Sequence, residues 1–218
     1  MLSQGRSDLS LMDSTTLAVI KGITVVQDND GRVHWQSGAA VDADGANGQN
    51  GNPFAYREDD TGLDALANAG YPNKSWRDVL VVDPDTDQPT DDGNGNWYSS
   101  TTYAWKDRPL ETRYVDATAV PYVVVNPRVR ARAKGVVIGC KARVAYKGKK
   151  KKKTIDAVVA DVSGGNDIGE MSIAAAKKLG IPDSPGHGGV DSGVSFEFWP
   201  DQAATVNGEV YELQPAGH

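Results

Sequence analysis

The segment from Ala157 to Ile181, AVVADVSGGNDIGEMSIAAAKKLGI, constrains the fold more than any other part of the chain. An apolar, β-branched run ends on Asp161, and a glycine-rich turn separates this residue from Glu170. The pattern predicts a short alanine-rich helix that begins at about Ser172 and ends at Gly180. Because glycine lets the intervening backbone fold back on itself, the strand, turn and helix are expected to bring two carboxylates to one place.

Paired carboxylates in a cleft built from loops are what acid/base hydrolysis of a glycosidic bond requires. Each acid also has a structural explanation, because an Asp at a strand end often caps a turn and a Glu before a helix complements the helix dipole. If the pair is catalytic, the apolar run before Asp161 should raise its pKa and make it the general acid. Glu170 should stay ionised and act as the base, with the two carboxyl groups roughly 6.5 to 9.5 Å apart on one groove.

The remaining chain is patterned mostly as β-strands. Strands are predicted at residues 23–27, 33–35, 79–82, 122–125, 136–146, 154–160 and 194–199, with a terminal hairpin arm at 206–213. The order of elements in the second half of the chain is similar to that of the double-psi β-barrel. It consists of a basic strand, a turn, a strand ending in Asp, a glycine loop, a helix and a final strand. That barrel is shared by barwin-like proteins, expansins and family 45 cellulases. We therefore expect a mainly β fold, with a double-psi β-barrel-like six-stranded core and one short helix in residues 110–218. Long loops in residues 1–109 should pack on the barrel, so that the chain forms one compact domain.

Three motifs carry a resemblance to a known enzyme family. They are ADVSGGNDIGEMSIAAA at 160–176, TGLDA at 61–65, and YVDA at 114–117 running into PYVVV at 121–125. They resemble the glycoside hydrolase family 75 chitosanases, in which an Asp ending a strand and a Glu in a Gly-Glu-x-Ser-Ile segment are the catalytic acids. The resemblance implies that Asp161 and Glu170 are these acids and that the protein is secreted or extracellular. The chain departs from the fungal members at Ala160 and at Val162-Ser163-Gly164, and it lacks their cysteines.

Composition excludes several other classes. No apolar stretch approaches the twenty residues of a membrane span, so no membrane insertion is expected, and no signal peptide is visible at the N-terminus. The lone Cys140 can form no internal disulfide and is expected to be a small buried hydrophobe. No cluster of His and Cys exists, and the loop DADGANGQNG lacks the acidic spacing of a calcium loop. We therefore expect neither a metal nor another cofactor, and a monomer.

The net charge of −6 is unevenly distributed. Residues 128–153 contain no acid and end in the run KGKKKKK, so the remainder of the chain is markedly acidic. An acidic remainder suits a polycationic polysaccharide such as chitosan, whose glucosamine units carry protonated amines. The lysine run is most simply a solvated hairpin turn. No aromatic residues are interleaved with it as single-strand binding would require, so no nucleic-acid partner is expected.

Several residues outside the pair are candidates for substrate binding. Sugar rings stack on aromatic side chains, and hydroxyls or amines of the substrate bind carboxylates and histidine. Each candidate has a structural alternative as a core aromatic, a turn acid or an exposed turn histidine. The candidates are Asp64, Trp97, Tyr98, Trp105, Asp116 and His187.

Three functions remain open. The first is an inverting endo-chitosanase that cleaves β-1,4 linkages. The second is a muramidase or lytic transglycosylase acting on bacterial peptidoglycan, delivered by a phage or a secretion system. The third is a non-hydrolytic glycan-binding barrel, which needs neither carboxylate to have a raised pKa, whereas a transglycosylase needs one.

Overall fold

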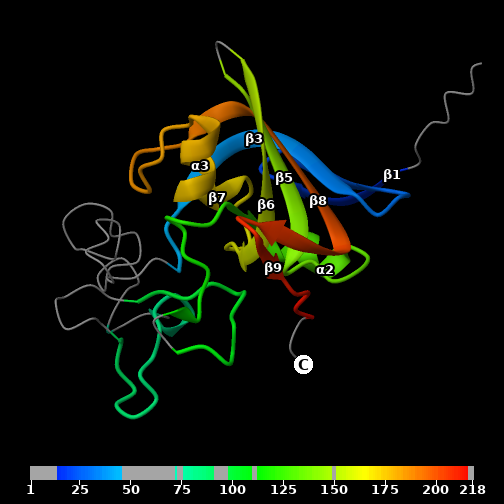
Figure 1. Cartoon of the computed structure of the whole chain (residues 1–218). Helices are drawn as coiled ribbons and strands as arrows, with labels where there is room; N and C mark the ends of the chain where they lie inside the picture. Colours follow the sequence, from blue (N-terminus) through cyan, green and yellow to red (C-terminus); the bar gives the residue numbers. More distant parts are fainter. Residues whose placement is uncertain are drawn as a thin grey trace, which may run out of the picture.

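The computed structural model describes residues 14–45, 72, 76–90, 98–109, 112–148 and 151–215 (Figure 1). Nine strands form its framework: β1 Ser14–Ile20, β2 Ile23–Asp28, β3 Val33–Asp42, β4 Tyr122–Val125, β5 Cys140–Lys147, β6 Lys152–Val162, β7 Glu170–Ser172, β8 Val190–Val206 and β9 Glu209–Tyr211. The helices of the described residues are short: the 3-10 helix η2 Trp76–Asp78 and the α-helices α2 Pro127–Arg132 and α3 Ile173–Leu179. The expected mainly β fold is confirmed.

Six strands close into a barrel in the order β3-β7-β4-β6-β5-β8, because β3 pairs with β8 as well as with β7. Two of the pairings are parallel, β3 with β7 and β4 with β6, and the other barrel pairings are antiparallel. The hairpin β1–β2 extends the sheet beyond β3, and β9 extends it beyond β8. The predicted six-stranded barrel core is therefore present.

The barrel strand β3 comes from the N-terminal part of the chain. Residues 33–42 were expected to contribute only a short strand in a segment wrapped around a barrel that begins at about residue 110. In the structure β3 lies between β7 and β8 and closes the barrel, so the core draws on both sides of that boundary. A closed barrel needs a strand that pairs with the free edge of β8. The sequence does not show which strand does so, and the structure shows that it is β3.

Aromatic and β-branched side chains fill the barrel. Trp35 on β3 stacks on Phe196 of β8 with ring centroids 4.9 Å apart, and Phe198 meets the same indole edge-on. Cys140 is fully buried and burial raises its pKa, as expected of a structural thiol. These contacts tie the N-terminal strand to the C-terminal half of the chain.

The helices follow local signals. Ser172 caps α3 by accepting a hydrogen bond from the Ala175 amide, and Gly180 ends it in the left-handed conformation at φ 77°, both as predicted. Helix α2 was not predicted, although Asn126 followed by Pro127 is a typical helix start, and Asn126 does cap it. The predicted strand at 79–82 contains only isolated bridges, from Leu80 to Ser99 and from Val82 to Pro89. Among the described residues, no helix is long and apolar enough to cross a membrane.

Candidate functional site

The register of β4 with its two neighbours brings Asp161 and Glu170 to one place. Val124 pairs with Asp161 of β6 on one side and with Glu170 of β7 on the other. A bulge in β6 makes this possible, because Val123 pairs with Val159 while Val124 skips a residue to Asp161. Residues paired on one rung share a face, so both acids project with Val124. Two strand spacings of about 4.8 Å separate them, so their Cα atoms lie about 10 Å apart.

Both acids line one open cleft of about 440 Å³. Its walls also include Asp42 and Asp44 from the end of β3, Ser100 to Thr102 from the loop region before β4, and Ser163 and Gly164 from the glycine turn. Four carboxyl groups therefore line one cleft. The predicted convergence of Asp161 and Glu170 on one groove is confirmed; the carboxyl separation of 6.5 to 9.5 Å stays a prediction.

Asp161 is the most buried acid of the cleft, with 6% of its surface exposed. Burial raises the pKa of its carboxyl, in the predicted direction. Three donors oppose this by stabilising the ionised form at Oδ1: the Thr102 amide at 3.0 Å, the Thr102 hydroxyl at 2.8 Å and the Val162 amide at 2.7 Å. Burial is the larger effect, so the pKa of the Asp161 carboxyl lies above its usual range.

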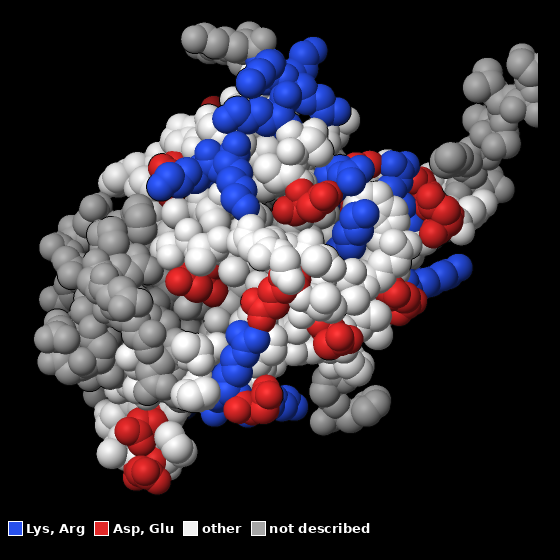
Figure 2. All heavy atoms as spheres, in the orientation of Figure 1, with Lys and Arg blue, Asp and Glu red and all other residues white. Residues whose placement is uncertain are grey.

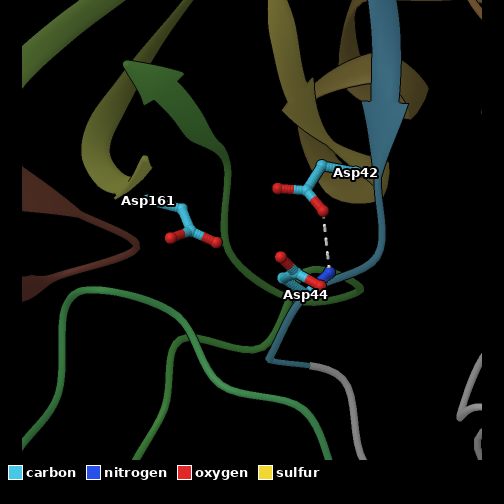
Figure 3. A group of neighbouring side chains, drawn as sticks. All are labelled: Asp42, Asp44 and Asp161. Carbon is cyan, nitrogen blue, oxygen red and sulfur yellow. Dashed lines mark hydrogen bonds between the residues drawn. The ribbon is translucent and has the colours of Figure 1, made fainter. Parts of the chain in front are cut away.

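Asp42 and Asp44 complete the cluster (Figure 3). Asp44 lies beside Asp161, and its side chain acts to lower the pKa of the Asp161 carboxyl, against the larger effect of burial. The Asp44 amide donates to Asp42 Oδ1 at 2.9 Å, which fixes the turn after β3. One oxygen from each of the three acids lies within 4.8 Å of the others, close enough to share a hard cation instead of a proton. From the sequence, this stretch is considered only as a calcium loop and is set aside because its acidic spacing is irregular, so neither Asp42 nor Asp44 is predicted to lie beside Asp161.

Glycine and asparagine position the segment that carries Glu170. Gly169 has φ +90°, and a Cβ there would lie 2.6 Å from the Gly38 carbonyl oxygen and from Ser37 Oγ, so β7 can approach β3 only with glycine at this position. Asn126 Nδ2 donates to the carbonyls of Gly164, Gly165 and Asp167, at 3.4, 3.2 and 2.8 Å. These contacts hold the glycine turn between the two candidate acids.

Two predicted substrate residues do not line this cleft. Asp116 binds its own turn, accepting from the Thr118 amide at 2.8 Å and hydroxyl at 2.7 Å, which is the structural role left open for it. His187 is exposed in the turn after α3 and is not among the residues that form the cleft wall. Asp64 and Trp97 lie outside the described residues.

The two described aromatic candidates both make packing contacts. Tyr98 is 6% exposed. Trp105 is half-buried, with the Arg108 guanidinium 3.7 Å from its ring centroid and with Tyr103 and Tyr211 against it. One face of the indole is therefore occupied by Arg108, while Trp105 also lines a cavity, so a role in stacking a sugar ring stays a prediction.

A second, larger cavity of about 720 Å³ shares one wall residue, Thr102, with the cleft. Its walls include Tyr103, Ala104 and Trp105 on one side and Ile138, Leu213 and Gln214 on the other. Gln214 is fixed by a paired contact, donating to the Ala104 carbonyl at 2.8 Å and accepting from its amide at 3.3 Å.

Comparisons with known proteins give little information about this site. No family model matches the chain, and no curated protein matches it. A Streptomyces papain inhibitor of known structure is similar over 46% of this chain and 89% of its own, with 22% identity and a TM-score of 0.28. A likeness this weak indicates nothing about activity.

Proposed function

We propose that the protein is a glycoside hydrolase that cleaves β-1,4 linkages of chitosan by an inverting acid/base mechanism. The observation that carries the proposal is the pairing of Val124 with both Asp161 and Glu170, which turns both acids toward one cleft. A spacing of about 10 Å between their Cα atoms is compatible with the 6.5 to 9.5 Å between carboxyl groups that an inverting enzyme needs for its water.

Asp161 is the proposed general acid. Its burial favours the protonated form, which can donate to the leaving-group oxygen when the glycosidic bond breaks. Glu170 is less buried and is the proposed base, which removes a proton from the attacking water on the opposite side of the sugar ring.

Asp42 and Asp44 support the proposal that the substrate is cationic. With Asp161 and Glu170 they make the cleft acidic, and an acidic cleft attracts the protonated amines of glucosamine. In an endo-acting enzyme, the cavity that shares Thr102 with the cleft would hold neighbouring sugars of the polymer. The resemblance of residues 160–176 to family 75 chitosanases supports the same substrate.

Product analysis of the wild type and two variants tests this proposal. Chitosan oligosaccharides should appear with the wild type, and Asp161→Asn and Glu170→Gln should each lower the rate by roughly 10² or more, the effect typical of losing general acid or base catalysis. Asp167→Asn is the matched control, because Asp167 lies in the same turn but is exposed and paired with Lys21. Either catalytic variant retaining activity within a few-fold would exclude the assignment.

A peptidoglycan lytic transglycosylase is the second candidate. It needs one acid/base group, and Asp161 is the cleft carboxyl with a pKa raised by burial. Incubation with purified peptidoglycan followed by mass spectrometry separates the two candidates, because a transglycosylase leaves anhydro ends. The absence of products from chitosan, chitin and peptidoglycan would favour a glycan-binding barrel.

A further inference from the structure

The hairpin of β5 and β6 carries lysines on both of its faces. Lys147 pairs with Lys152, and the next rung pairs Tyr146 with Lys153. Side chains alternate between the two faces of a ribbon, so Lys147 and Lys152 project from one face and Lys153 from the other. Lys151 is exposed beside the turn. The hairpin projects beyond the barrel (Figure 1), and Figure 2 shows Lys and Arg side chains gathered at this end of the molecule.

Helix α3 adds two further charges. Lys177 and Lys178 are exposed in its last turn, and Lys153 Nζ donates to the Lys178 carbonyl at 3.3 Å, which joins helix and hairpin. The acid further along the hairpin, Asp156, is paired with Arg143. Among the described residues, no ion pair neutralises the six lysines of this patch: Lys147, Lys151, Lys152, Lys153, Lys177 and Lys178.

We propose that this lysine patch binds a flexible, linear anionic polysaccharide. A flexible chain can pass around the hairpin and meet lysines on both faces, whereas a flat lipid surface meets only the end. Single-stranded nucleic acid would need several aromatic side chains on which bases stack, and the hairpin offers only Tyr146, which packs against the core. Lysine ammonium groups are mobile point charges without the planar fork of arginine, so they suit repeated anionic groups of variable spacing.

The patch is opposite in sign to the carboxylate cleft, so the two surfaces attract different polymers. This inference does not rest on the proposed hydrolase activity, because its ligand and its residues are both different from those of the cleft.

Binding to heparin, a sulfated polysaccharide, tests the proposal on the full chain. The test variant carries Lys147→Gln, Lys151→Gln and Lys152→Gln, all at exposed positions. The matched control removes the same charge at exposed positions elsewhere, with Lys106→Gln, Arg128→Gln and Lys134→Gln. A lysine at an anionic surface contributes about fivefold in affinity, so the test variant should bind roughly 10- to 100-fold more weakly, with the control within about threefold of the wild type. Wild-type binding should fall steeply as salt is raised.

Acetylation of surface lysines in the wild type provides a second measurement that needs no variant to fold. Heparin should protect Lys147, Lys151 and Lys152 from acetylation and leave Lys106 and Lys134 reactive. Equal binding by the test variant and the wild type, or equal protection of all five lysines, would overturn the proposal. Tighter binding to a single-stranded oligonucleotide or to vesicles with 30% anionic lipid than to heparin would overturn the polysaccharide assignment.

Discussion

Thr102 offers a direct way to shift the protonation of the proposed acid without touching its carboxyl group. Its hydroxyl donates to Asp161 Oδ1 at 2.8 Å and so stabilises the ionised form. Thr102→Val removes that donor and nearly preserves the side-chain shape, while the amides of residues 102 and 162 still donate to the same oxygen. The pKa of Asp161 should therefore rise above its wild-type value.

The size of this shift follows from the strength of the lost contact. A hydrogen bond to a charged group contributes about 1.5 to 3 kcal/mol, and 1.36 kcal/mol corresponds to one pKa unit. Thr102 itself is exposed and two donors remain, so we take the lower end and expect a rise of about one unit. A general acid works while protonated, so the alkaline limb of the pH–rate profile should move about one unit upward.

The assay is the rate of chitosan cleavage across pH for the wild type, Thr102→Val and Thr102→Ser. The serine variant keeps a hydroxyl donor and should keep the wild-type profile. Titration of the Asp161 carboxyl by carbon NMR gives the same quantity without relying on catalysis. A folded Thr102→Val protein whose Asp161 pKa is unchanged or lower would refute the reasoning.

Three further outcomes are expected. Burial raises the folded-state pKa of Asp161 above its unfolded value of 3.8, so ionisation of this carboxyl destabilises the fold as pH rises above 3.8. Asp161→Asn should therefore raise Tm at neutral pH, and calorimetry should show that this gain vanishes in acid. Gly169→Ala should lower stability by more than the roughly 1 kcal/mol typical of positive φ alone, because its Cβ would clash with the Gly38 carbonyl. Gly208→Ala, with φ +85° and nothing within 4 Å of its Cβ, is the control in urea unfolding, and equal losses would contradict the clash. Asn126→Asp keeps the oxygen that caps α2 but loses the amide donor to the glycine turn. The free energy of unfolding of this variant should therefore fall by about 1 to 3 kcal/mol. An unchanged value would show that other contacts hold the turn.

Much of the local structure around Asp161 could be predicted from the sequence. The strand ending in Asp161, the glycine turn, and helix α3 with its Ser172 cap and Gly180 stop all appear where the pattern indicates. Strands β5 and β6, on either side of the lysine run, also pair as the antiparallel arms of a hairpin. These features depend on backbone preferences and on contacts between residues near one another in the chain, which a sequence displays directly.

Only the tertiary structure decided the composition of the cleft. Asp42 and Asp44 lie more than a hundred residues before Asp161, and they reach it because β3 closes the barrel. The bulge that aligns Asp161 with Val124 depends on strand register, which no local pattern specifies. Packing likewise decided the surroundings of Trp105, because Arg108 covers one face of its ring. Side-chain types and local turns can be read directly from the sequence. The partners of a side chain depend instead on how distant strands pair and on the free energy of the whole packed barrel.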